Sequence, residues 1–212
     1  MKIKKILLPI VVVEIYIFVS FCIIEWLYNH EMLISINDIE QSNFWIWFSY
    51  NIILGALILA GAGFALSRKI NLIRHLKLVP DKHKITYILF AIYIVMFFVI
   101  HDFSISGCSR WIYYLIFIAA EEEIVFRGYL FKELEKEVPI FIAIILSGLI
   151  WGSVHAFMPM ITHEPMTVDP MSLIFREAFN GVGAGALFVL LYKKSDSLLV
   201  PILVHAILDY VI

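Results

Sequence analysis

The chain has 212 residues, of which 62% are hydrophobic and 16% are charged, and its formal net charge is −2. This composition is far more apolar than that of soluble domains and is typical of polytopic membrane proteins, so the lipid bilayer is the expected partner. The small negative charge excludes a strongly basic protein that binds nucleic acid. The two cysteines offer no disulfide framework and no CxxC motif.

Apolar stretches of helical length follow one another along the whole chain and predict an all-α bundle of about seven transmembrane spans. The first stretch is interpreted as a retained span, because it is too long for a signal peptide, carries Glu14 and Glu25, and has no small-x-small cleavage site. In the sixth, Gly181 and Gly185 form a small-xxx-small face for close helix packing. The predicted spans are residues 6–28, 44–66, 85–100, 111–131, 138–158, 171–192 and 198–212.

Lysine and arginine concentrate in alternate connections between these spans. Most of them lie at the N-terminus and in residues 67–84, 132–137 and 193–197, whereas the acidic or polar loops fall between these connections. The positive-inside rule then places the N-terminus in the cytoplasm and the C-terminus outside. We expect one membrane-embedded domain over residues 1–212 of a multi-pass protein of the cell membrane. Its motif-bearing core covers about residues 111–212, and residues 1–110 form the N-terminal spans.

Three consecutive acids, Glu121 to Glu123, lie near the middle of the span 111–131. Each ionised carboxylate costs roughly 2.5–3.5 kcal/mol at the centre of a transmembrane helix, so these acids predict a site. On a helix, Glu123 and Arg127 are four residues apart and can pair, while Glu122 lies about 100° further round and can face a cavity. The alternative is a structural ion-pair cluster that holds the bundle together.

Histidine and aspartate occur at interior depth in two other spans. If spans four and five form an antiparallel hairpin, Glu122 lies about 23 Å and His155 about 26 Å from the turn, which places them at nearly the same level. His205 and Asp209 are four residues apart, hence on one helix face. Either group alone is also compatible with ordinary packing. Their coincidence with the acids predicts one converged site.

These residues fit two hydrolytic mechanisms. In one, Glu122 takes a proton from water that His155 helps to position, while His205 and Asp209 polarise a carbonyl and stabilise the oxyanion. In the other, the same groups hold a zinc ion with an open water position. Other intramembrane protease classes are disfavoured, because the chain has no HExxH motif, no serine elbow and no pair of aspartates in a GxGD context.

The pattern resembles the CAAX protease and bacteriocin-processing family (CPBP, also called Abi) of intramembrane endopeptidases. That family carries an EExxxR motif, then FxxxH, then HxxxN or HxxxD on successive helices. The resemblance covers about residues 111–212. The matching motifs are Glu122-Glu123-x-x-x-Arg127, Trp151-x-x-x-His155 and His205-x-x-x-Asp209.

The resemblance implies an all-helical membrane protease in which Glu122 and His155 activate water and His205 and Asp209 form the oxyanion side. It favours a glutamate mechanism without a cofactor over the zinc alternative. Trp151 replaces the usual phenylalanine. Asp209 stands where prenyl-protein proteases have asparagine, and an ionised aspartate cannot donate to an oxyanion, so it orients His205 or is protonated.

The leading hypothesis is therefore an intramembrane endopeptidase that hydrolyses a peptide bond of a small hydrophobic or lipidated peptide or protein. The alternatives are a non-catalytic membrane protein that binds a bacteriocin and confers immunity, or a proton-coupled carrier that uses Glu122 and His155 as a relay. Binding would survive Glu122→Gln, and a carrier would show flux that depends on a pH gradient. Carriers are usually built from inverted repeats, and no such repeat is found in the sequence.

Overall fold

The computed structural model describes residues 2–67, 71–100 and 102–211, and every regular element in those residues is a helix. The predicted all-α fold of a membrane helix bundle is confirmed. The chain divides into two compact units, each described below by itself. Unit 1 comprises residues 1–31 and 125–190, and unit 2 comprises residues 32–124 and 191–212. That the whole chain forms one membrane domain stays a prediction.

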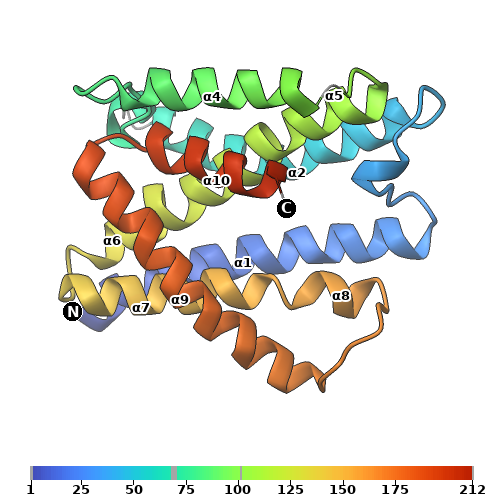
Figure 1. Ribbon diagram of the computed structural model, residues 1–212. Coiled ribbons are helices and arrows are strands. Elements are labelled where there is room, and N and C mark those ends of the chain that lie inside the picture. The colour runs from blue at the N-terminus through green and yellow to red at the C-terminus, as the bar shows by residue number, and fades with distance from the viewer. Residues whose placement is uncertain (1, 68–70, 101, 212) are drawn as a thin grey trace. The chain divides into compact units, whose positions relative to one another are not determined.

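Unit 1 is built on the long first helix, α1 (Lys2–Asn29), which contacts the short helices α6 (Lys132–Leu134) and α8 (Phe157–Ile161). Polar contacts hold α1 near both of its ends. The Nζ atom of Lys5 lies 3.2 Å from a carboxylate oxygen of Glu137, and the Tyr28 hydroxyl donates to the carbonyl of Thr162 at 3.0 Å. Helix α1 is thereby fixed against the segments before α7 and after α8 (Figure 1).

Within unit 1, α7 (Ile140–Val154) and α9 (Pro170–Ser195, whose residues up to 190 belong to this unit) approach each other through glycines. A Cβ atom placed on Gly148 would lie 2.8 Å from the Cα of Val182, and one on Gly185 would lie 3.3 Å from the Cα of Gly148. The Gly181 backbone is packed just as closely against Gly152. The predicted packing face of Gly181 and Gly185 is confirmed, and its partner is a second pair of glycines four residues apart.

The fifth apolar stretch is interrupted where one continuous helix was predicted over residues 138–158. Helix α7 ends at Val154, a turn follows, and α8 begins at Phe157. Pro159 explains the break, because proline lacks the N–H that would bond to the carbonyl of His155 in a continuous helix. In α8 the proline instead occupies the first turn, where no intrahelical donor is needed.

Unit 2 contains most of the remaining helices. Helix α10 (Leu199–Val211) packs against α4 (Ile85–Ile100) and against the π-helix η2 (Tyr113–Ala120). Figure 1 shows α10 and α4 running alongside each other within this unit. The other elements of unit 2 are η1 (Ile36–Asp38), α2 (Phe44–Ser67), α3 (Leu72–His75) and α5 (Ile105–Ile112).

The acid-bearing helix begins earlier in the chain than predicted, and much of it is π-helical rather than α-helical. Helix α5 begins at Ile105, capped by the Ser104 hydroxyl, which accepts from the Gly107 N–H at 3.0 Å, so the prediction of a loop up to residue 110 was wrong. The helix then continues through η2 and, after Glu121 and Glu122, through a second π-helix, η3 (Glu123–Phe131). π-Helical turns bond i→i+5, are rare, and occur frequently at functional sites.

The start of α10 is held by a segment far away in the sequence. The N–H of Leu198 donates to the carbonyl of Lys77 at 3.0 Å, and the Ser197 hydroxyl donates to the carbonyl of Val79. The side chains of Lys77 and Asp196 form an ion pair. Lys77 has a left-handed backbone (φ 55°) and closes α3 in a Schellman motif. We call these contacts between residues 77–79 and 196–198 the α10 clasp.

Asp81 fixes the start of α4 in unit 2. Its carboxylate accepts hydrogen bonds from the backbone N–H groups of His83, Ile85 and Thr86 and from the Thr86 hydroxyl, at 2.7 to 3.1 Å. Burial acts to raise the pKa of Asp81, but these donors outweigh it and lower the pKa from 3.8 to about 2. The carboxylate therefore remains ionised in any physiological medium.

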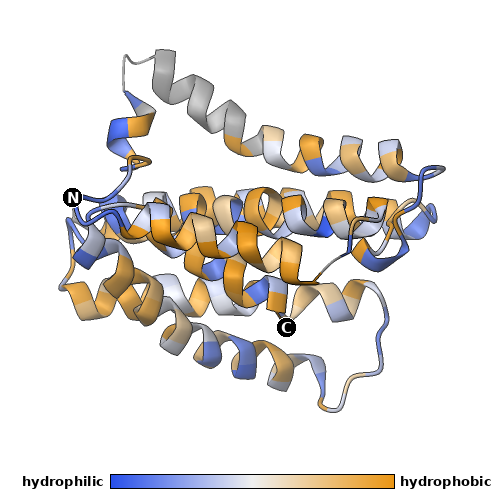
Figure 2. Cartoon of the chain, turned by 45° about the horizontal axis from the view of Figure 1, so that its top comes forward, coloured by the Kyte–Doolittle hydropathy of each residue, from blue (hydrophilic) through white to orange (hydrophobic). Residues whose placement is uncertain are grey.

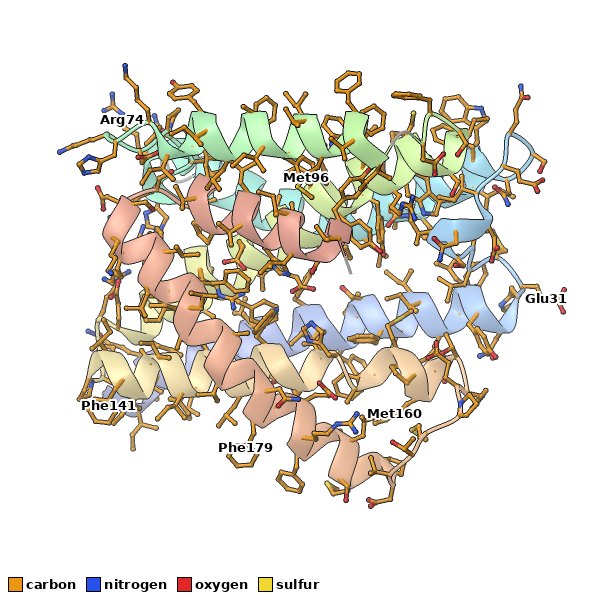
Figure 3. The ribbon with its side chains drawn as sticks, viewed as in Figure 1. Glu31, Arg74, Met96, Phe141, Met160 and Phe179 are labelled. Carbon is orange, nitrogen blue, oxygen red and sulfur yellow. The ribbon has the colours of Figure 1, made fainter. Side chains whose placement is uncertain are left out.

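Apolar side chains dominate the helices and polar ones gather in the connections of each unit, as Figure 2 shows. Among the described residues, three helical stretches are long and apolar enough to cross a membrane, and three shorter apolar helices accompany them. In unit 1 the rings of Phe141 and Phe179 point away from their helices (Figure 3) and are 60% and 69% exposed. Such surfaces suit a lipid environment, whereas the number of spans and the side of the N-terminus stay predictions.

Candidate active site

Four of the six predicted site residues meet within unit 2. Glu122 lies between η2 and η3, Glu123 is the first residue of η3, and His205 and Asp209 lie on α10. Because α10 packs against η2, the histidine reaches the acids although 82 residues separate it from Glu123. The predicted convergence of the first and third motifs is visible in these contacts.

The shortest contact of the site is a buried hydrogen bond between His205 and Glu123. The Nδ1 atom of His205 lies 3.0 Å from Oε1 of Glu123, and Glu123 is fully buried while His205 is 5% exposed. Where the carboxylate is ionised it only accepts, and Nδ1–H is then the donor. Sequence reasoning had assigned Glu123 to Arg127 and had not foreseen His205 as a partner.

The other ring nitrogen of His205 faces two further carboxylates. Its Nε2 atom lies 3.4 Å from Oδ2 of Asp209 and 3.9 Å from Oε2 of Glu122. The side chains of Asp209 and Glu122 are 26% and 20% exposed, so this side of the imidazole is open, unlike the Glu123 side. One histidine is thus bordered by three carboxylates, of which one is sealed in the protein and two are accessible.

The remaining two predicted residues belong to unit 1. The guanidinium carbon of Arg127 lies 4.1 Å from the centroid of the Trp151 ring and 4.9 Å from that of Phe188. Arg127 is 2% exposed, so both rings stabilise its charge where water is excluded. The aromatic residue of the second motif therefore contacts the arginine of the first motif.

His155 is the exposed residue that closes α7. Its Nδ1 atom lies 3.2 Å from the carbonyl oxygen of Trp151, and its ring stands edge-on to the Trp151 ring with 5.1 Å between the centroids. Trp151 thus contacts both Arg127 and His155. His155 and Arg127 belong to unit 1, whereas Glu122 and Glu123 belong to unit 2. That His155 lies close to Glu122, and that Arg127 pairs with Glu123, therefore stay predictions.

An apolar groove of about 520 Å³ lies in unit 2, and sequence reasoning missed it. Ala120 and Ile124 of the acid-bearing helix line it, as do Ile202 and Leu203 of α10, whereas the predicted site residues do not. The groove forms where α4, α10 and the acid-bearing helix meet. The periodicity of single helices carries no signal for such a meeting. The other lining residues are Leu78, Pro80, Thr86, Tyr87, Phe90, Leu115, Ile116 and Leu199.

The zinc alternative requires His and carboxylate donors that converge on one point. Across the described residues, no three His, Cys, Asp or Glu side chains are arranged to hold a metal ion. His205 contributes one nitrogen to Glu123 and turns the other toward Asp209 and Glu122. The zinc alternative and a mechanism without a cofactor both stay predictions.

Comparison with known proteins locates the chain in a family. Searches of curated proteins and of solved structures gave no match. A family model described as "Type II CAAX prenyl endopeptidase Rce1-like" matches residues 104–211, about half of the chain, and this stretch contains all three motifs. The predicted resemblance is confirmed, and the chain belongs to the Rce1-like family of type II CAAX prenyl endopeptidases.

Proposed function

We propose that this membrane protease is a glutamate-type endopeptidase of the cell membrane that hydrolyses a peptide bond of a small hydrophobic or lipidated peptide or protein. Family membership supports a CAAX-type protease acting on a peptide or prenylated protein in a membrane. The observation that carries the proposal is the position of His205 between Glu123 on one side and Glu122 and Asp209 on the other.

In the proposed mechanism Glu122 is the general base. It takes a proton from a water molecule, the oxygen of that water attacks the carbonyl carbon, and the proton later passes to the departing amine. His155 helps to position the water. A water or carbonyl oxygen close to Nε2 of His205 is also close to Glu122, because these two groups lie 3.9 Å apart.

His205 stabilises the oxyanion in this scheme. Glu123 holds Nδ1, and Asp209 lies close enough to Nε2 to orient the ring. An imidazole that donates from both nitrogens is positively charged, which suits it to stabilise a developing negative charge in a site of low dielectric. This arrangement gives Asp209 the orienting role and requires no hydrogen bond from Asp209 to the oxyanion.

The apolar groove favours an apolar group on the substrate. It is formed by the same helices that carry Glu122 and His205, so a lipid chain or a large hydrophobic side chain held there would belong to a substrate of this site. Ligand sites are typically apolar concavities, and the lining of this groove is almost entirely apolar. Burial of each methylene contributes about 0.8 kcal/mol to binding.

The test is cleavage of a farnesylated peptide and of its unmodified counterpart by the purified protein, followed by mass spectrometry. Glu122→Gln keeps the shape and removes the base, so we expect cleavage to fall by at least about 100-fold. Glu121→Gln is the matched control, and it should retain the rate. Full activity of Glu122→Gln would refute the assignment, and a preference for the unmodified peptide would refute the role of the groove.

A further inference from the structure

A second groove, remote in sequence from the catalytic motifs, lies between α1 and α8 in unit 1. It has a volume of about 420 Å³ and is lined by residues of α1, α8 and the turn after α8. Glu14 and Glu25 both line it. They are eleven residues apart, which is three helical turns or about 16 Å, so both carboxylates lie on the same face of α1.

Neither carboxylate makes a polar contact with the residues that the structure describes. Within the described part of the chain, Glu14 and Glu25 are exposed and have no hydrogen-bond or ion-pair partner. Both belong to an apolar helix that is long enough to cross a membrane. An ionisable group on such a helix is costly unless it faces a polar or charged partner, so each calls for a counter-charge.

The wall between the two acids is apolar and aromatic. Phe21 and Phe157 pack across it with 5.0 Å between their ring centroids, and Phe18 and Met160 extend it (Met160 is labelled in Figure 3). The groove therefore combines an apolar floor with a negative charge on α1 toward each end.

We propose that this groove binds an apolar helical peptide that carries two basic side chains about three turns apart on the face that enters the groove. The apolar face covers the aromatic wall, and one lysine or arginine pairs with each of Glu14 and Glu25. This is recognition of a helix in a groove, with specificity supplied by charge spacing. The proposal is independent of peptide hydrolysis, and α1 lies outside the residues that match the family model.

Charge complementarity selects this occupant over others. Two carboxylates repel an anionic lipid or phosphate headgroup. A second copy of the chain fits poorly, because none of the described helices carries two basic residues eleven positions apart. A partner helix with the required spacing satisfies both acids and the apolar wall together.

Cys22 provides a direct reporter for the test. It is exposed and lines the groove between the two acids, whereas Cys108 lies in unit 2 and serves as the internal control. The probe is a synthetic helix of about 20 Leu and Ala residues with two lysines eleven positions apart. At ten times its dissociation constant we expect the peptide to slow alkylation of Cys22 by N-ethylmaleimide about tenfold, with Cys108 unaffected.

Matched peptides and variants make the result decisive. Glu14→Gln combined with Glu25→Gln should lose the protection of Cys22, and Glu31→Gln should keep it, since Glu31 lies beyond α1 and outside the groove (Figure 3). Equal protection by a peptide with glutamates in place of lysines, or with lysines seven apart, would overturn the proposal. That comparison uses the unaltered protein, so it holds even if the double variant fails to fold. Dimers cross-linked through Cys22 without peptide would identify a second copy as the occupant and would also overturn the proposal.

Discussion

Nδ1 of His205 and Oε1 of Glu123 form a hydrogen bond of 3.0 Å between two side chains that are almost completely removed from solvent. This bond joins α10 to the acid-bearing helix at its most polar point. Glu123 thus contacts Nδ1 of the His205 ring in the protein interior, whereas the partly exposed carboxylates of Glu122 and Asp209 face Nε2 of the same ring.

Removing the histidine from this bond should destabilise the fold. We expect His205→Ala to lower the free energy of unfolding by about 3–5 kcal/mol, because the buried carboxylate of Glu123 loses its hydrogen bond with His205. The measurement is the thermal unfolding of the protein in detergent. Glu123→Gln removes the charge, so the double variant should be less destabilised than the sum of the single changes. Strict additivity would show that the two side chains do not interact.

The contact between Arg127 and Trp151 predicts a graded response to substitution. Trp151→Phe keeps an aromatic face for the guanidinium, whereas Trp151→Leu removes it and should lower stability by a further ~0.5–2 kcal/mol. Arg127→Ala should reduce the yield of folded protein still more strongly, since it also empties a buried site. Yield and unfolding temperature of the three variants provide the measurement. Equal stability of the Phe and Leu variants would contradict a cation–π contribution.

The glycine contact between α7 and α9 offers a clean pair of variants. Gly181→Ala places a methyl group against the backbone of α7 and should cost about 1–3 kcal/mol. At Gly183 a Cβ would meet nothing within 4 Å, so Gly183→Ala should be neutral or stabilising by up to ~1 kcal/mol through helix propensity. Chemical unfolding of both variants measures the difference. A similar loss in both would show that the close approach is not what limits substitution at Gly181.

Asp81 predicts a dependence of stability on acid pH. Its pKa is lowered from 3.8 to about 2, so its contribution to stability is fully present above pH 4 and is lost as the pH falls from about 4 toward 2. Asp81→Asn should flatten this part of the curve of stability against pH. The check is unfolding of both proteins at a series of pH values in detergent. An unchanged acid limb would rule out Asp81 as its source.

The sequence was informative about helices because apolar stretches and basic connections are local features. It was less informative about how helices end and widen. Pro159 carried a readable signal for the break after α7, whereas nothing in residues 113–131 announces i→i+5 turns. The site residues likewise divide into those that local spacing predicts and those that long-range packing brings together. The spacing of His205 and Asp209 placed them on one face, but the pairing of Glu123 with His205 depends on how α10 packs against η2. Long-range packing of this kind also created both grooves.

The α10 clasp ties the motif-bearing stretch to residues that lie outside it. Residues 77–79 lie upstream of the stretch that matches the family model, yet their carbonyl groups fix the residue from which α10 starts. The motif-bearing stretch therefore depends on another part of the chain, because residues 77–79, which carry no motif, hold the start of its last helix, α10. If residues 77–79 held α10 one residue earlier or later, His205 would move by about 1.5 Å along the helix axis. Residues 77–79 thus set the height of the imidazole along the axis of α10, although they contain no motif residue.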